Sequence, residues 1–283
     1  AANKNVASLE KALGERLMNR TTRTVSLTEE GEAFLRQARI ALEALDRATE
    51  AVIAHRAAPT GNVRISTSVG FGCEQLTPIL PGLLERYPGL SVEVDFDDRV
   101  VDLIHDRYDM ALRGGRIVDS SLVSRPICRF NLVVVAAPSY LDRYGIPRRP
   151  EDLAQHRLLT RRFLGGRVAP WDFLNEDGSI TTFDTGAAVM TLSSPEAVTQ
   201  AAVSGVGIAN VGVHHAWKHL LSGQLKVLLL DWHHPGSFEM TLQYPHHALV
   251  APRVRVTVDY LLESFARLEE LHVPLTALRG YRA

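Results

Sequence analysis

The 283-residue chain contains only two cysteines, and Cys73 and Cys128 do not form a C-x-x-C pair. This scarcity argues against a disulfide framework and against a cysteine zinc site. No run of about 18 apolar residues, the length that a membrane-spanning helix needs, occurs in the sequence, and no signal-peptide pattern is present. We therefore expect a cytoplasmic protein with the composition of an ordinary globular chain, 46% hydrophobic and 22% charged.

The chain also lacks an excess of charge of one sign and the common catalytic motifs. Its net charge is −1, so composition alone does not predict binding to nucleic acid. There is no G-x-S-x-G, no phosphate-binding loop and no H-E-x-x-H, and we expect neither an enzyme nor a cofactor. His215 and His219 share a helix face, but no carboxylate or cysteine lies at a fixed offset, so no metal site is predicted.

The N-terminal residues have the pattern of a helix followed by a small β-ribbon. Leu9 and Leu13 are four residues apart, and Gly14 is a natural helix terminator because glycine accepts a left-handed backbone. Residues 16–20 and 24–28 are two short strand candidates. A ribbon of this kind, with hydroxyl groups and arginine at its tip, can contact phosphates on both sides of a groove.

Three motifs in this region resemble the second half of the DNA-binding domain of LysR-type transcriptional regulators. In that family a Leu-Glu pair ends the recognition helix, the wing reads R-T-x-R, and L-T-x-x-G opens the linker helix. Here these are Leu9 and Glu10, residues 20–23 and residues 27–31. The resemblance continues to the far end of the chain, and it implies that about 30 residues of a winged helix-turn-helix domain precede residue 1.

The resemblance makes the helix and the wing the candidate DNA-contacting surfaces. Short polar side chains on a recognition helix reach base edges in the major groove, and arginines of a wing contact phosphates. A solvated helix face is the alternative interpretation for each helix residue. The candidate DNA-binding residues are Asn3, Lys4, Asn5, Ser8, Arg20, Thr21, Thr22 and Arg23.

A long helix is predicted to start at Thr28, whose side chain is suited to the N-cap, with Glu29 and Glu30 favoured by the helix dipole. Apolar residues then recur in steps of three and four, which is typical of a helix that pairs with another helix. We predict a dimer, and the resemblance implies a homodimer or homotetramer; packing on the chain's own domain is the alternative. The seam residues are Leu35, Ala38, Leu42, Leu45 and Val52.

Proline and glycine after this helix mark a hinge, and strand and helix patterns alternate beyond it. Expected elements include a strand over residues 63–67, a short helix over 100–107 and a doubly buried strand over 130–137. The alternation predicts two α/β lobes around a cleft, and the resemblance implies a domain similar to periplasmic solute-binding proteins. The expected domains are a partial winged helix-turn-helix (1–27), a linker helix (28–57), a hinge (58–61), lobe I (62–138 and 242–283) and lobe II (139–241).

Residues at strand ends are the candidate effector site. The turn after the first strand of lobe I places backbone N–H groups and glycine at a helix start, which favours an anion, and Arg113 follows a strand end, where α/β sheets bind ligands. An ordinary turn is the alternative, as is an Arg113 that ties its strand to Asp95 or Asp97. No dense acidic cluster is evident nearby, so we expect an organic anion. The candidate residues are Ser68, Val69, Gly70, Phe71, Arg113, Gly114, Thr160, Ser193, Ser194 and Asn210.

The chain is thus identified as a LysR-type regulator whose effector changes the closure of the lobes and so the DNA binding of the oligomer. The resemblance implies double-stranded promoter or operator DNA, a small-molecule effector and RNA polymerase as partners. The first alternative is a cytoplasmic small-molecule sensor that, in this shorter form, does not bind DNA. The second is an enzyme built on the same two-lobed fold.

Overall fold

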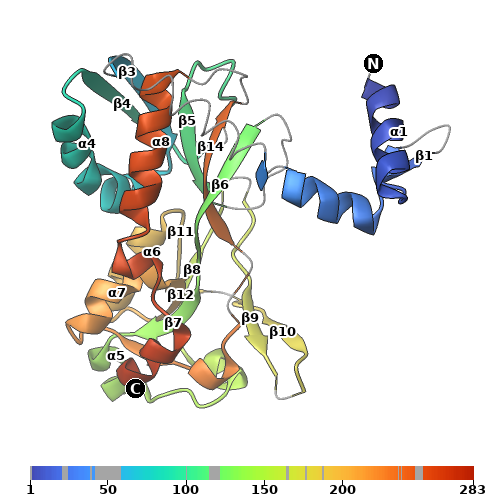
Figure 1. Ribbon diagram of the computed structural model, residues 1–283. Helices are drawn as coiled ribbons and strands as arrows, with labels where there is room; N and C mark the ends of the chain where they lie inside the picture. The colour runs from blue at the N-terminus through green and yellow to red at the C-terminus, as the bar shows by residue number, and fades with distance from the viewer. Residues whose placement is uncertain are drawn as a thin grey trace. The chain divides into compact units, whose positions relative to one another are not determined.

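The computed structural model describes residues 2–20, 25–38, 40–41, 59–99, 101–114, 122–163, 166–175, 177–186, 188–234, 236, 238–245 and 251–283. The chain forms two compact units, Ala1–Ala58 and Pro59–Ala283 (Figure 1). No helix among the described residues is long and apolar enough to cross a membrane.

The first unit contains a helix and a hairpin, as the sequence predicts. Helix α1 spans Ala2–Leu13 and ends at Gly14, which has a left-handed φ of 74°. Strands β1 (Met18–Arg20) and β2 (Val25–Leu27) pair antiparallel, with Asn19 opposite Ser26. Residues 29–38 and 40–41 are helical.

The spacing of the N-terminal motifs is explained by their contacts with one buried residue, Leu17. The Glu10 carboxylate accepts hydrogen bonds from the backbone N–H groups of Leu17 (2.9 Å) and Met18 (3.1 Å). The Thr28 backbone N–H donates to the Leu17 carbonyl (3.0 Å), and the Thr28 hydroxyl accepts from the Gly31 N–H (2.9 Å), which confirms the predicted N-cap. A Cβ at Gly31 would overlap the Leu17 carbonyl.

Lobe I is built on a five-stranded sheet with the order β4-β3-β5-β14-β6. Its first three strands are parallel, and β14 runs antiparallel to both β5 and β6. Its core packs helices α3 and α8 and the turns between α3 and α4 on one face, around Ile65, Phe71 and Phe265. The strands are β3 (Gly61–Thr67), β4 (Leu90–Phe96), β5 (Met110–Gly114), β6 (Leu122–Arg129) and β14 (Glu239–Pro245), and the helical segments are α3 (Val69–Phe71), η1 (Gly72–Leu76), η2 (Thr77–Ile79), α4 (Leu80–Arg86) and α8 (Pro252–Phe265).

Lobe II has a second five-stranded sheet with the order β11-β8-β12-β7-β13. One face packs against α6 and α7 around Leu159 and Trp217, and the other packs around Tyr140 and Trp171. The β9–β10 hairpin (Trp171–Leu174 and Ile180–Phe183) is an antiparallel pair of its own. The other elements are β7 (Leu132–Ala136), α5 (Pro138–Tyr144), η3 (Pro150–Gln155), β8 (Leu158–Arg161), β11 (Met190–Leu192), α6 (Pro195–Val203), β12 (Ile208–Gly212), α7 (Val213–Leu221), β13 (Lys226–Leu228), η4 (Leu230–Trp232) and η6 (Leu275–Tyr281). The short segment η5 (Glu269–Leu271) precedes η6 at the boundary between the lobes, with Leu271 in the lobe I core.

The chain passes from lobe I to lobe II before residue 138, where the sequence analysis placed the end of lobe I. Strand β7 belongs to the lobe II sheet, so the chain changes lobe between β6 and β7. The C-terminal segment also differs from the expectation, since Val273 and Leu278 pack in the lobe II core rather than in lobe I. Both differences arise because a buried apolar run does not reveal from sequence alone which of two cores it joins.

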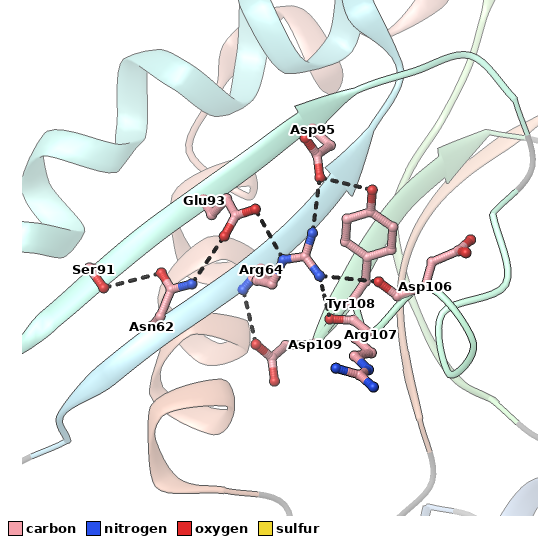
Figure 2. Close-up of polar contacts among 9 residues, drawn as sticks. All are labelled: Asn62, Arg64, Ser91, Glu93, Asp95, Asp106, Arg107, Tyr108 and Asp109. Atoms are coloured by element: carbon pink, nitrogen blue, oxygen red, sulfur yellow. Dashed lines mark hydrogen bonds and ion pairs between the residues drawn. The ribbon is translucent and has the colours of Figure 1, made fainter.

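Arg64 of β3 is the centre of a polar network that fixes the loop before β5 (Figure 2). Its guanidinium contacts Glu93 (3.1 Å) and Asp95 (3.5 Å) of β4 and donates to the carbonyls of Asp106 (3.1 Å) and Arg107 (3.2 Å). The expected helix over 100–107 is wrong, because residues 103–107 form turns and Arg107 has a left-handed φ of 59°. The left-handed backbone of Arg107 breaks the helical pattern, and the carbonyls of residues 106 and 107 point at Arg64.

Candidate DNA-binding and effector sites

The candidate DNA-contacting residues lie on α1 and the hairpin that follows it. The α1 backbone carries Asn3, Lys4, Asn5 and Ser8, and Arg20 ends β1. The tip of the hairpin, Thr21, Thr22 and Arg23, lies outside the described residues. A helix followed directly by a ribbon is the arrangement that a winged DNA-binding domain requires.

The predicted helix seam is described at its first positions. Leu35 is exposed and Ala38 is half-buried within the single chain. Leu42, Leu45 and Val52 lie outside the described residues. An exposed leucine on a helix is apolar surface that a partner helix could cover.

Arg113 of β5 is partly buried, and only part of its guanidinium is paired. Its Nη2 donates to the Ser66 hydroxyl (2.7 Å) and its Nη1 donates to the Asp97 carbonyl (3.0 Å). Its buried Nε has no hydrogen-bond partner among the described residues. Burial lowers the pKa of Arg113, although Asp97 and Asp98 favour its charge. The side chain therefore does tie its strand to residue 97, through the backbone, and its charge remains only partly compensated.

Arg161, at the end of β8, is the corresponding arginine of lobe II. Its guanidinium lies over the Phe163 ring, 4.7 Å from the centroid, and its Nε donates weakly to the Ser193 carbonyl (3.4 Å). Burial lowers its pKa as well, and the negative charges that oppose this effect are Asp98 and Glu196. Asp98 thus influences one arginine from each lobe. We call Arg113, Arg161, Asp98 and Glu196 the charged junction.

The helix start predicted to bind an anion is already occupied by carboxylates of the chain itself. The Val69 N–H donates to Asp98 Oδ1 (3.2 Å). Glu196 of lobe II reaches across to Gly70, where a Cβ would overlap its carboxylate. The sequence shows no dense acidic cluster near this turn, but the fold brings two carboxylates, Asp98 and Glu196, to it from distant parts of the chain. Glycine at position 70 is needed for this close approach.

The remaining candidates differ in how available their side chains are. The Phe71 ring packs in the lobe I core against Phe265, with centroids 5.4 Å apart, so only its backbone can serve a ligand. The Ser194 hydroxyl accepts from the Ala197 N–H (3.1 Å) as the N-cap of α6, and it donates to Glu196. Thr160 is buried, and its hydroxyl has no partner among the described residues. Ser68, Gly114 and Ser193 have partly or fully exposed positions, and Asn210 of β12 is half-buried.

A cavity of about 380 Å³ lies beside the charged junction, between η1 of lobe I and helices α6 and α7 of lobe II. His215 of α7 lines this cavity and is largely buried. Its Nδ1 lies 2.8 Å from Glu74 of lobe I, and its Nε2 lies 3.7 Å from Glu196 of lobe II. Burial would raise the pKa of Glu74, but the hydrogen bond and charge of His215 and the charge of Lys218 outweigh it and lower that pKa. The cavity therefore contains an ionised carboxylate from lobe I.

The histidine pair predicted on α7 does not act as a unit. His215 faces Glu74, whereas His219 Nδ1 lies 2.9 Å from the amide oxygen of Gln224. Within the part of the chain that is described, no three histidine, cysteine, aspartate or glutamate side chains are arranged to hold a metal ion.

The sequence did not identify four residues of this region as candidates for the effector site. They are Glu74, Asp98, Arg161 and Glu196. Asp98 lies two residues beyond the end of β4, so the strand-end rule that selected Arg113 would also have found it. Glu196 and Glu74 have no such signal, since each acts on the opposite lobe.

Comparison with known proteins agrees with this geometry. Residues 56–266 match the LysR substrate binding domain, and residues 1–32 match the bacterial regulatory helix-turn-helix protein of the lysR family. An HTH-type transcriptional repressor of Pseudomonas aeruginosa is 30% identical over 96% of this chain and 86% of its own.

Solved structures are similar over both units. CrgA, a LysR-type transcriptional regulator from Neisseria meningitidis, has a TM-score of 0.70 and 29% identity, over 94% of this chain and 89% of its own. The full-length virulence activator AphB of Vibrio cholerae has a TM-score of 0.64 and 27% identity, over 92% and 88% of the two chains. These proteins are transcriptional regulators rather than enzymes, and the regulator is favoured over a sensor without DNA binding. The chain belongs to the LysR-type transcriptional regulators, with a helix-turn-helix segment and a two-lobed effector-binding domain.

Proposed function

We propose that the effector is a small organic acid that binds at the charged junction and changes how the two lobes meet. The observation that carries this proposal is the pair of partly buried arginines, Arg113 and Arg161, one from each lobe. A carboxylate placed between the two guanidinium groups would accept charge-assisted hydrogen bonds, which are about twice as strong as neutral ones. A ligand that bridges both lobes binds one state of closure better, which is the condition for an allosteric effect.

Calorimetry on the full chain with a panel of organic acids tests this proposal. Arg161→Gln should weaken binding of the acid that responds best by about 10-fold or more, because a bond to a charged group is lost. Arg143→Gln on the exposed side of α5 is the matched control and should bind as the wild type does. Equal affinities in all three proteins would mean that the acid binds elsewhere.

We propose further that the protein acts in the cytoplasm as a homodimer or homotetramer on promoter or operator DNA, where it affects RNA polymerase. In this proposal Asn3, Lys4, Asn5 and Ser8 of α1 approach the bases. The wing residues Arg20, Thr21, Thr22 and Arg23 contact phosphates. The helical seam that begins at Leu35 holds two chains together.

Sedimentation tests the seam. A Leu42→Glu, Leu45→Glu variant should associate more weakly than wild type, because charges would face each other along the paired helices. Ile40→Glu is the control, since Ile40 is exposed but lies off the three-and-four repeat. An unchanged profile for the double variant would show that the seam is not an interface. Operator binding by mobility shift, with Arg20→Gln and Arg23→Gln variants, tests the wing in the same preparation.

A further inference from the structure

His215 of α7 lies between two carboxylates that belong to opposite lobes. Its side chain is only 6% exposed. Its Nδ1 lies 2.8 Å from Oε2 of Glu74, which is in η1 of lobe I, and its Nε2 lies 3.7 Å from Oε1 of Glu196, which is in α6 of lobe II. One imidazole ring is therefore within ion-pair distance of an acid from each lobe. We call Glu74, His215 and Glu196 the interlobe triad.

Both ring nitrogens of His215 thus face carboxylate oxygens. A neutral imidazole has one N–H donor and one lone pair, whereas the protonated ring has two N–H donors. In the neutral ring, one nitrogen would turn its lone pair toward a negative oxygen at a largely buried position. The protonated ring is the form that suits both neighbours, and its charge balances one of the two acids.

The groups beside His215 are consistent with a positive charge on its ring. Burial would raise the pKa of Glu74, but the hydrogen bond and the charge of His215 are the main causes that lower it. Burial lowers the pKa of the neighbouring His214, and the charge of His215 lowers it further. His214 is therefore the neutral member of the pair, and its ring stacks on Phe130 with centroids 4.5 Å apart.

The other basic residues of α7 do not replace the proton of His215. Lys218 Nζ lies 3.6 Å from Oε1 of Glu74, but its side chain is 67% exposed, so solvent screens this pair. His219 contacts Gln224 of its own lobe, 2.9 Å away. Among the described residues, neither of these two bases forms an ion pair with Glu196, which leaves His215 as the link between the two acids.

Glu196 connects the interlobe triad to the turn over residues 68–71, which we call the effector turn. The same oxygen that faces His215, Oε1, occupies the place where a Cβ of Gly70 would be. The other oxygen accepts a hydrogen bond from the Ser194 hydroxyl, a neutral group. Glu196 also favours the charge of Arg161. A positive charge on His215 therefore holds a carboxylate that contacts the effector turn and lies near one of the two arginines.

Glu74 connects the triad to the same turn along the chain. Segment η1 follows α3 without a break, so Glu74 lies three residues beyond Phe71 in one continuous helical stretch. This stretch includes a π-helical turn, a rare conformation that is frequent at functional sites. A ring that binds Glu74 and Glu196 together thus holds the effector turn from both sides.

We propose that His215 is a positioning residue of the effector site and that its proton fastens lobe I to lobe II at the effector turn. This inference rests on the proposed function, because it places the acid at the arginines beside that turn. Imidazoles change charge between about pH 5 and 8. As the pH rises through this range, the contact between the lobes weakens and a positive charge near the bound acid is lost. Both effects lower the affinity for an acid.

Urea unfolding of the full chain at pH 6 and pH 8 tests the interlobe triad without a ligand. Wild type, Glu74→Gln, His215→Asn and the double variant together isolate the coupling between the two side chains. We expect a coupling of about fivefold in the unfolding equilibrium constant at pH 6 and about twofold or less at pH 8. Glu74 is ionised at both pH values because its pKa is lowered from 4.5, so the change reports the proton on His215.

His219→Asn on the same helix is the matched control and should show no coupling to Glu74→Gln at either pH. Equal coupling at the two pH values, or none at pH 6, would overturn the inference. If His215→Asn does not fold, Glu74→Gln alone decides the question. Its loss of stability must then be larger at pH 6 than at pH 8, and an equal loss would overturn the inference.

Calorimetry at the same two pH values tests the link to the effector. Benzoate and pyruvate are suitable probes because both acids remain ionised from pH 6 to pH 8. The acid that binds more tightly should lose about fivefold in affinity over this range in wild type and much less in His215→Asn. An identical loss in both proteins would overturn the inference and leave the acid site in place. A pH-dependent coupling without binding of either acid would support the contact between the lobes and argue against the proposed acid site.

Discussion

Arg64 and Arg113 lie on the neighbouring strands β3 and β5, yet their guanidinium groups are satisfied to different degrees. Every guanidinium nitrogen of Arg64 has a partner from β4 or from the loop before β5 (Figure 2). Arg113 has partners for two nitrogens, and its buried Nε has none among the described residues. Complete pairing makes an arginine part of the architecture, while an incomplete set leaves it able to bind something else.

The largest effect is expected on removal of the fully paired arginine. Arg64→Leu would leave Glu93 and Asp95 as neighbouring carboxylates without their cation and would release the carbonyls of residues 106 and 107. We expect a loss of about 2–3 kcal/mol in the free energy of unfolding, measured with urea. Arg143→Leu on exposed α5 is the control, and a loss as small as that control's would show that the network does not stabilise lobe I.

Arg113→Leu should lower the free energy of unfolding by less, about 1 kcal/mol. The variant loses two hydrogen bonds, but it also removes a partly buried charge and with it the desolvation penalty, which offsets part of the loss. The same variant should lose most of its affinity for the organic acid, whereas Arg64→Leu protein that remains folded should retain it. Urea unfolding and calorimetry on both variants measure the contrast. Equal stability losses would remove the distinction between the two arginines.

Asp98→Asn tests how a neighbouring carboxylate affects ligand binding by Arg113 and Arg161. Asp98 accepts the Val69 N–H and favours the charge of both arginines, so it competes with a ligand carboxylate. An asparagine oxygen can still accept the Val69 bond, while the negative charge is gone. We expect the organic acid to bind about threefold more tightly, which corresponds to less than 1 kcal/mol. Weaker binding in this variant would indicate that Asp98 holds the arginines in place.

The smallest effect concerns the pH dependence of stability. The pKa of Glu74 is lowered from 4.5 in the folded protein, so the unfolded chain binds its proton more readily. The resulting stability is present above about pH 4.5 and is lost as the pH falls through the folded pKa. Glu74→Gln should flatten this part of the curve of unfolding free energy against pH, and the exposed Glu85→Gln should not. Identical curves for wild type and Glu74→Gln would contradict the lowered pKa.

Local patterns predicted the wing and most strands because their causes lie within a few residues. Gly14, Thr28 and the alternation in β3 each act on their own segment. Strand β6 was missed because Pro126 interrupts a strand pattern, and the structure accommodates it on an edge strand beside an irregularity in the pairing with β14. The approach of Glu196 to Gly70 could not be predicted, since only the packing of two lobes brings residues so distant in the chain together.

Leu17 makes the wing and the first turn of the next helix one stiff joint. Its N–H is held by Glu10 of α1 and its carbonyl by Thr28, and Gly31 lets the helix backbone come into direct contact with it. Among the described residues, Thr28 alone separates β2 from the helical segment that begins at residue 29. A rotation of the helical segment that begins at residue 29 would therefore turn the hairpin with it, because both are bonded to Leu17.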